Sequence, residues 1–123
     1  MKIAATLLAL SLPLMGATCE DARALLVKTC NTLADTYAHY DAVAASGVVS
    51  KINMARVAAV RAQTDDICAS PETATTISIT AAAARAYVAL NAAFKQGGTL
   101  RDAKVGYSQI IDLRRIADKA RSK

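Results

Sequence analysis

The stretch EDARALLVKTCNTLADTYAHYDAVAA, residues 20–45, decides the fold of this chain. Its apolar side chains recur every three or four residues, which is the spacing that places them on one face of a helix. That face comprises Ala22, Leu26, Cys30, Leu33, Tyr37, Tyr40 and Ala44. Gly47 follows the stretch, where a positive φ can end a helix. The stretch therefore predicts one amphipathic helix that needs other helices to cover its apolar face.

Three further helices are predicted downstream, over residues 51–68, 71–95 and 100–119. Ser50 and Ser70 precede the first two of these, where a side-chain oxygen can accept a hydrogen bond from a free backbone N–H. Pro71 then suits the first position of a helix, and Gly97 with Gly98 separates the last two helices. Short connections between helices favour antiparallel packing. We therefore expect an all-α fold, a small antiparallel bundle of about four helices.

Three details of this bundle stay open in the sequence. A helical hairpin that carries a looser C-terminal pair is an alternative arrangement. The β-branched run TATTISIT, residues 73–80, could form a short strand instead of a helical turn. Gly106 interrupts the last predicted helix and could mark a kink or a close crossing.

The composition supports helices that approach closely. Apolar residues make up 54% of the 123 residues, yet aromatic residues make up only 4% and tryptophan is absent. Much of the apolar content is alanine, which combines the highest helix propensity with a small side chain. This apolar content also excludes a low-complexity disordered chain.

The first 17 residues have the pattern of an export signal. Lys2 is the only charge before Glu20, and the apolar run IAATLLALSLPL follows it. A charged start and an apolar run of this length are typical of a signal peptide, whereas a transmembrane helix needs roughly 20 apolar residues. We expect residues 1–17 to be a signal peptide or an uncleaved signal anchor and residues 18–123 to form a single helical domain, in the periplasm or at a membrane. A first core helix is the alternative.

Helix arithmetic pairs two of the three cysteines. In an antiparallel hairpin that turns near Gly47, Cys30 and Cys68 differ in axial position by roughly 4–5 Å at 1.5 Å per residue. This offset suits the short Cα separation that a disulfide requires. Cys19 would be offset from Cys68 by roughly 12 Å. The sequence predicts a Cys30–Cys68 disulfide in an oxidising compartment, with buried free thiols in a reducing compartment as the alternative.

Cys19 lies at the junction between the leader and the first bundle helix. The three residues before it are Gly16, Ala17 and Thr18, which match a lipobox poorly because the leucine lies too far upstream. An unpaired cysteine in an exported chain can also bridge two copies. A lipid anchor, a free thiol and a homodimer through Cys19 are all left open.

No pattern in the chain predicts catalysis or metal binding. His39 is the only histidine, with Asp35 one helical turn before it, and no nucleophile is placed beside it by a motif. The cysteines lack the spacing of a metal site, and glycine-rich phosphate motifs are missing. We expect a non-enzymatic protein with no catalytic residue, metal or cofactor, and His39 on a solvated helix surface.

Basic residues gather at the C-terminal end. Residues 95–123 contain eight Lys or Arg against three Asp, whereas residues 18–94 contain six against seven acidic residues. A basic amphipathic helix can bind anionic lipid or an acidic partner protein. Nucleic acid is not expected, because an exported protein seldom meets it. An ordinary solvated helix face is the alternative. The candidate contact face comprises Arg101, Lys104, Arg114, Arg115 and Lys119.

Residues 33–76 carry a family resemblance. A tyrosine-containing helix, a Gly-then-Ser turn and a second helix that ends in D-x-x-C, followed by Ser70 and Pro71, resemble small exported or lipoprotein-like helical proteins of phage, prophage and proteobacterial genomes. The resemblance implies a phage or mobile-element origin and no assigned activity. We expect an exported, non-enzymatic protein that acts by protein or membrane contact in the cell envelope, as an accessory in lysis or exclusion. A structural component of a virion or secretion assembly is the alternative.

Overall fold

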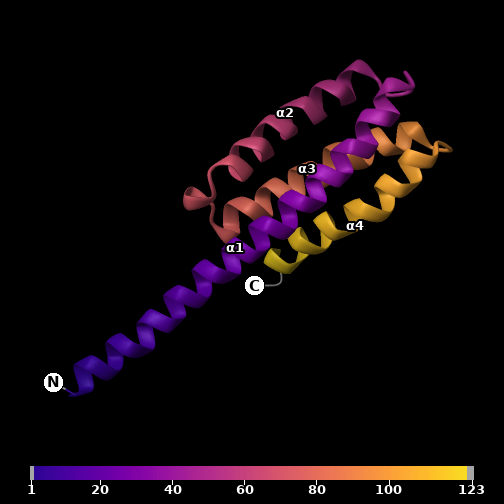
Figure 1. Ribbon diagram of the computed structural model, residues 1–123. Helices are drawn as coiled ribbons and strands as arrows, with labels where there is room; N and C mark the ends of the chain where they lie inside the picture. The colour runs from indigo at the N-terminus through magenta and orange to yellow at the C-terminus, as the bar shows by residue number, and fades with distance from the viewer. Residues whose placement is uncertain (1, 122–123) are drawn as a thin grey trace.

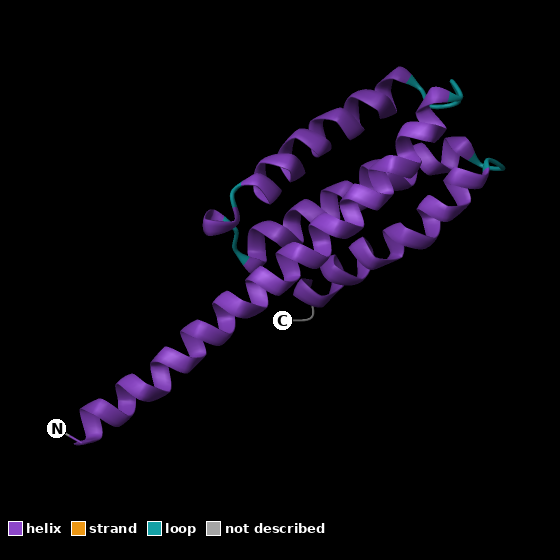
Figure 2. Ribbon diagram, in the orientation of Figure 1, coloured by secondary structure: helices purple, strands orange, loops and turns teal. Residues whose placement is uncertain are grey.

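A computed structural model describes the backbone of residues 2–121 and the side chains of residues 22–119. The described part of the chain is helical throughout apart from its short connections, and it contains no strand (Figures 1 and 2). The elements in chain order are α1 (Lys2–Ala45), α2 (Lys51–Ala69), the 3-10 turn η1 (Pro71–Thr73), α3 (Thr76–Gly97) and α4 (Arg101–Arg121). The predicted all-α antiparallel bundle is confirmed.

The four helices are not equivalent. In Figure 1, α1 and α3 lie between α2 on one side and α4 on the other, and the first half of α1 extends beyond the bundle. The helices α1, α3 and α4 pack against one another, whereas α2 packs mainly on α3 and only sparsely on α1. The alternative of a looser C-terminal pair is therefore wrong, because α4 belongs to the core and α2 is the peripheral helix.

The core lies among α1, α3 and α4. Its largest fully buried side chains include Phe94 and Leu90 from α3 and Ile110 and Leu113 from α4, with Val43 from α1. In contrast, α2 contributes only Val57 and Thr64 as buried residues. Small side chains let the core helices approach closely, as the alanine-rich composition predicts.

Gly106 marks a close crossing rather than a kink. Helix α4 runs without interruption from Arg101 to Arg121, and the ring of Phe94 occupies the space beside Gly106. A Cβ atom placed on Gly106 would lie 2.7 Å from Cε2 of Phe94 and closer still to two other ring carbons. The missing side chain is therefore what allows Phe94 to fill the contact between α3 and α4.

Helix α3 begins five residues later than predicted. The Thr75 hydroxyl accepts a hydrogen bond from the Ser78 backbone N–H at 3.0 Å, and the Ser78 hydroxyl accepts one from the Thr75 N–H at 2.9 Å. This reciprocal capping box starts the helix at Thr76. Pro71 begins η1 instead, and the Ser70 side chain caps neither element. The strand alternative for residues 73–80 is wrong for the same reason, because the capping box commits Thr76 onward to helix.

Candidate functional site

A disulfide clamps the peripheral helix to α1. Cys30 and Cys68 are bonded, with their Cα atoms 6.0 Å apart, so the predicted pairing is confirmed. The bond joins the middle of α1 to the last turn of α2. Because α2 has few other contacts with α1, this covalent link is the main tie between these two helices.

A buried polar contact also joins α1 to α2. The hydroxyls of Tyr37 and Thr64 lie 2.8 Å apart, and the Thr64 hydroxyl also donates to the backbone carbonyl of Arg61 at 3.1 Å. A hydroxyl has one proton, so Tyr37 must donate to Thr64. Burial raises the pKa of the Tyr37 hydroxyl above its ordinary value of 10.0. The contact is complete only while Tyr37 keeps its proton.

Arg61 adds a partly exposed ion pair over this contact. Its guanidinium donates to both carboxylate oxygens of Asp41 in α1, at 2.8 and 3.3 Å, and its Cζ lies 4.8 Å from the centroid of the Tyr37 ring. The hydrogen bond to Asp41 raises the pKa of Arg61. Exposed ion pairs contribute little energy, so this pair orients α2 more than it stabilises it.

His39 ties α1 to α4 and is only partly solvated, rather than lying on the open helix surface that the sequence predicts. Its Nδ1 atom lies 3.1 Å from Oδ1 of Asp102 in the first turn of α4, and only 26% of the imidazole is exposed. The partner is therefore a residue 63 positions away rather than Asp35 on the same helix. This histidine fills a structural role at the interface between two helices.

The predicted basic face divides into two parts. All five of its residues are exposed. At 100° per residue, Arg114 lies about a quarter-turn or more from the others, and its Cζ sits 5.9 Å from the ring centroid of Tyr87 in α3. Arg114 also pairs with Asp118 at 3.5 Å. It therefore lies toward the contact between α3 and α4, although most of its side chain is exposed.

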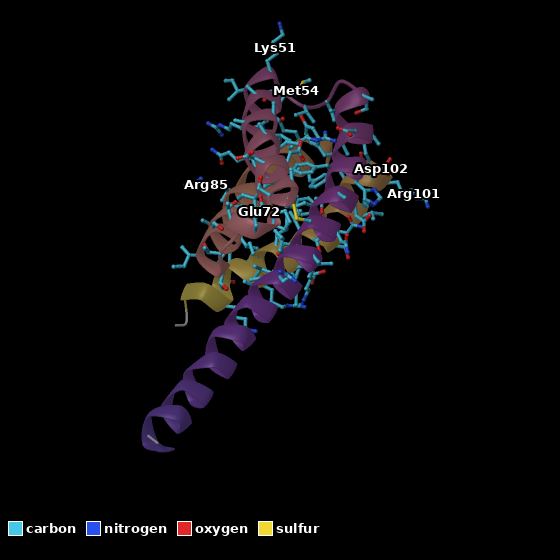
Figure 3. All side chains as sticks on the ribbon, turned by 60° about the vertical axis from the view of Figure 1, so that its left-hand side comes forward. Lys51, Met54, Glu72, Arg85, Arg101 and Asp102 are labelled. Atoms are coloured by element: carbon cyan, nitrogen blue, oxygen red, sulfur yellow. A yellow bond between two sulfur atoms is a disulfide. The ribbon has the colours of Figure 1, made fainter. Side chains whose placement is uncertain are left out.

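The remaining four basic residues form the outer basic face of α4, which we define as Arg101, Lys104, Arg115 and Lys119. Arg115 pairs with Asp112 at 3.3 Å. Among the described side chains, no carboxylate lies within 4.0 Å of the cationic nitrogens of Arg101 or Lys104. Figure 3 shows Arg101 pointing away from the bundle. The end of α4 nearest the α3–α4 turn therefore presents two exposed cations without an ion pair, on either side of Asp102 in the sequence.

A groove between α2 and α3 was missed by sequence analysis. It has a volume of about 560 Å³, and its lining is mostly alanine and valine, together with Arg56 and Gln63 from α2 and Arg85 from α3. Its alanine-lined walls carry no distinct signal in a chain that is rich in alanine throughout. Periodicity marks the apolar face of a helix without showing how much of that face other helices cover.

The remaining predicted features are Cys19, the leader and the expected absence of a metal site. The side chain of Cys19 and those of the predicted leader, residues 1–17, belong to the part of the chain whose side chains are not described. Within residues 22–119, no group of three His, Cys, Asp or Glu side chains could hold a metal ion. By length and composition α3 could cross a membrane, but half of its apolar window is buried in the bundle.

Comparison with known proteins adds no relative. No protein-family model, curated protein or solved structure matches this chain.

Proposed function

We propose that this chain is a non-enzymatic exported protein that acts in the cell envelope through contact of the outer basic face with an anionic membrane surface or an acidic envelope protein. The observation that carries the proposal is that Arg101 and Lys104, at the exposed end of α4, make no ion pair with any described carboxylate. Cations near a membrane surface each contribute about 1 kcal/mol to binding anionic lipid. A rigid helix that presents several of them on one side is suited to such a contact.

The disulfide supports the export part of this proposal. Disulfides persist in oxidising compartments and are rare in the cytosol. The Cys30–Cys68 bond closes a separation of 38 residues and clamps a helix that otherwise has few contacts with α1. An oxidising compartment would therefore maintain the bond that holds α2 to α1. The resemblance of residues 33–76 to exported phage and prophage proteins makes an accessory role in lysis or exclusion the biological context of the proposal.

Vesicle flotation tests the contact. The purified protein should float with vesicles that contain phosphatidylglycerol and should bind neutral phosphatidylcholine vesicles less, with the difference lost at high salt. The neutral vesicles measure whatever binding the apolar leader causes. The double substitution Arg101→Gln with Lys104→Gln should weaken the salt-sensitive binding about 30-fold, since two cations supply about 2 kcal/mol.

The matched control is Arg114→Gln. It removes one positive charge from the same helix, but this guanidinium lies over Tyr87 and pairs with Asp118. It should leave the flotation within about twofold of the parent protein. Two results would contradict the assignment of the contact to the outer basic face. One is equal flotation on both vesicle types, and the other is an equal loss of flotation in the double variant and in Arg114→Gln.

Intact mass of the protein from its native host tests the export part. A cleaved leader or an added lipid at Cys19, together with the two-hydrogen mass deficit of the disulfide, is the expected outcome. An uncleaved, fully reduced chain in the cytoplasmic fraction would refute export.

A further inference from the structure

We propose that the groove between α2 and α3 binds a single acyl chain that carries an anionic head group. The groove is separate from the outer basic face. Arg85, which lines the groove, and Arg101 lie on opposite sides of the bundle in Figure 3. The proposal therefore concerns a second site, and it does not depend on the contact made by α4.

The groove exists because small side chains face one another across the two helices. Ala59 of α2 and Ala84 and Ala92 of α3 line it, and Val88 lies between the latter two with 67% of its surface exposed. Larger residues at these alanine positions would close the space between neighbouring helices. A valine this exposed beside a hollow of about 560 Å³ leaves apolar surface that a ligand could cover.

The only charged side chains that line the groove are cations. Arg85 donates to the side-chain oxygen of Gln63 at 3.3 Å, which is a neutral acceptor. No carboxylate among the described side chains lies within 4.0 Å of the guanidinium nitrogens of Arg85 or Arg56. Both arginines are therefore available to pair with an anion.

The two arginines mark different ends of the groove. Gln63, which contacts Arg85, lies seven residues beyond Arg56 on α2. Seven residues of helix span roughly 10 Å. The lining of the open groove thus spans about two helical turns, with an arginine near each end, so a chain could lie along it with its head group at either arginine.

These features together select the occupant. A volume of about 560 Å³ falls in the range of small-molecule sites, and two turns is short for a docked helix, which uses anchors over a longer face. Walls of methyl groups offer almost no hydrogen bonds to a sugar or nucleotide. An alkyl chain suits these walls, and a carboxylate or phosphate head suits an unpaired guanidinium.

A titration with 15N-labelled full-length protein tests the proposal. The probes are dodecanoate, dodecyl phosphate and dodecyltrimethylammonium, each below its micelle concentration, with chemical shifts of backbone amides as the readout. Saturable shifts confined to α2 and α3 are expected with the two anions, and binding roughly tenfold weaker or more is expected with the cation. The tighter of the two anions identifies the head group as that of a fatty acid or of a phospholipid derivative.

Substitutions in the groove locate the site. Ala59→Phe fills the groove from an exposed position and should abolish the saturable shifts. Ala58→Phe is the matched control, because this neighbouring alanine is also exposed but does not line the groove. The leader is common to both variants, so it cannot explain a difference between them.

Charge removal tests the head-group contact independently. Arg56→Gln with Arg85→Gln should weaken dodecanoate binding roughly tenfold, whereas Arg101→Gln should leave it unchanged. The proposal is overturned if all three probes bind equally or if Ala59→Phe binds as the parent does. It is also overturned if the groove amides respond only to intact vesicles, or if they respond only to protein concentration, as they would in a dimer.

Discussion

Removal of the Cys30–Cys68 disulfide is expected to lower the free energy of unfolding by about 4 kcal/mol. The perturbation is the double substitution Cys30→Ala with Cys68→Ala, which removes the bond without leaving a free thiol. The bonded residues are 38 positions apart. In the loop-entropy model, a closed loop of this length removes about 13 cal/mol/K from the unfolded chain, which gives about 4 kcal/mol at 25 °C.

The structure gives a reason to expect the full effect. The Cα atoms of the bonded cysteines lie 6.0 Å apart, which is within the usual range for disulfides. A domain of this size has a total stability of about 5–15 kcal/mol. Losing about 4 kcal/mol should lower the melting temperature by about 15 °C or more.

Thermal melts followed by circular dichroism at 222 nm measure this change. Cys19→Ala is the matched control, because it removes a cysteine without breaking the Cys30–Cys68 bond. The parent protein treated with reductant should melt like the double variant. A double variant that melts within about 3 °C of the parent would refute the argument that chain entropy stabilises this fold.

Three further predictions follow from other contacts. Gly106→Ala should destabilise the protein by about 1–3 kcal/mol in urea titrations, because its methyl group overlaps the buried ring of Phe94 and outweighs the better helix propensity of alanine. Tyr37→Phe should cost about 1 kcal/mol, since Thr64 keeps its bond to a backbone carbonyl. The folded-state pKa of Tyr37 is raised by burial, so its contribution is complete below pH 10 and is lost as pH rises further; Tyr37→Phe should flatten this alkaline loss of stability. His39→Ala should cost less than about 1 kcal/mol, because its partly exposed pair is weak.

Local signals in the sequence predict most of the helix boundaries. Ser50 accepts a hydrogen bond from the Asn53 N–H at 3.3 Å and starts α2 as predicted, and Gly47 and Gly98 have the positive φ that ends a helix. The predicted start of α3 was wrong because the sequence contains two possible N-caps, Ser70 and Thr75, five residues apart. Proline is common at the first position of a helix, which favoured a start at Pro71. The side chains of Thr75 and Ser78, however, accept hydrogen bonds from two backbone N–H groups, and this capping box sets the start of α3.

Contacts between helices were harder to predict. The disulfide could be predicted from the axial positions of Cys30 and Cys68 along two antiparallel helices, because this calculation needs only the position of the turn between them. The partner of His39 did not, because Asp102 is brought beside it by the packing of α4 on α1. The placement of Arg114 over Tyr87 depends on the rotation of α4 about its own axis. Net charge along a sequence predicts a basic helix, but it does not say which cations turn toward a neighbouring helix.

The clamp and the groove have a common origin in the thin packing of α2. A helix that buries only Val57 and Thr64 is weakly held by apolar contacts. It is also fastened at its start, where the Ser50 N–H donates to the Gln96 side chain at 2.8 Å, along its length by the Tyr37–Thr64 contact, and at its end by the disulfide through Cys68. Because these ties hold α2 in place, it can carry alanine where a self-supporting helix would need larger side chains. Ala59 of α2 and the alanines of α3 opposite it leave the space between the two helices open, so the ties that hold α2 in place also permit the groove of about 560 Å³.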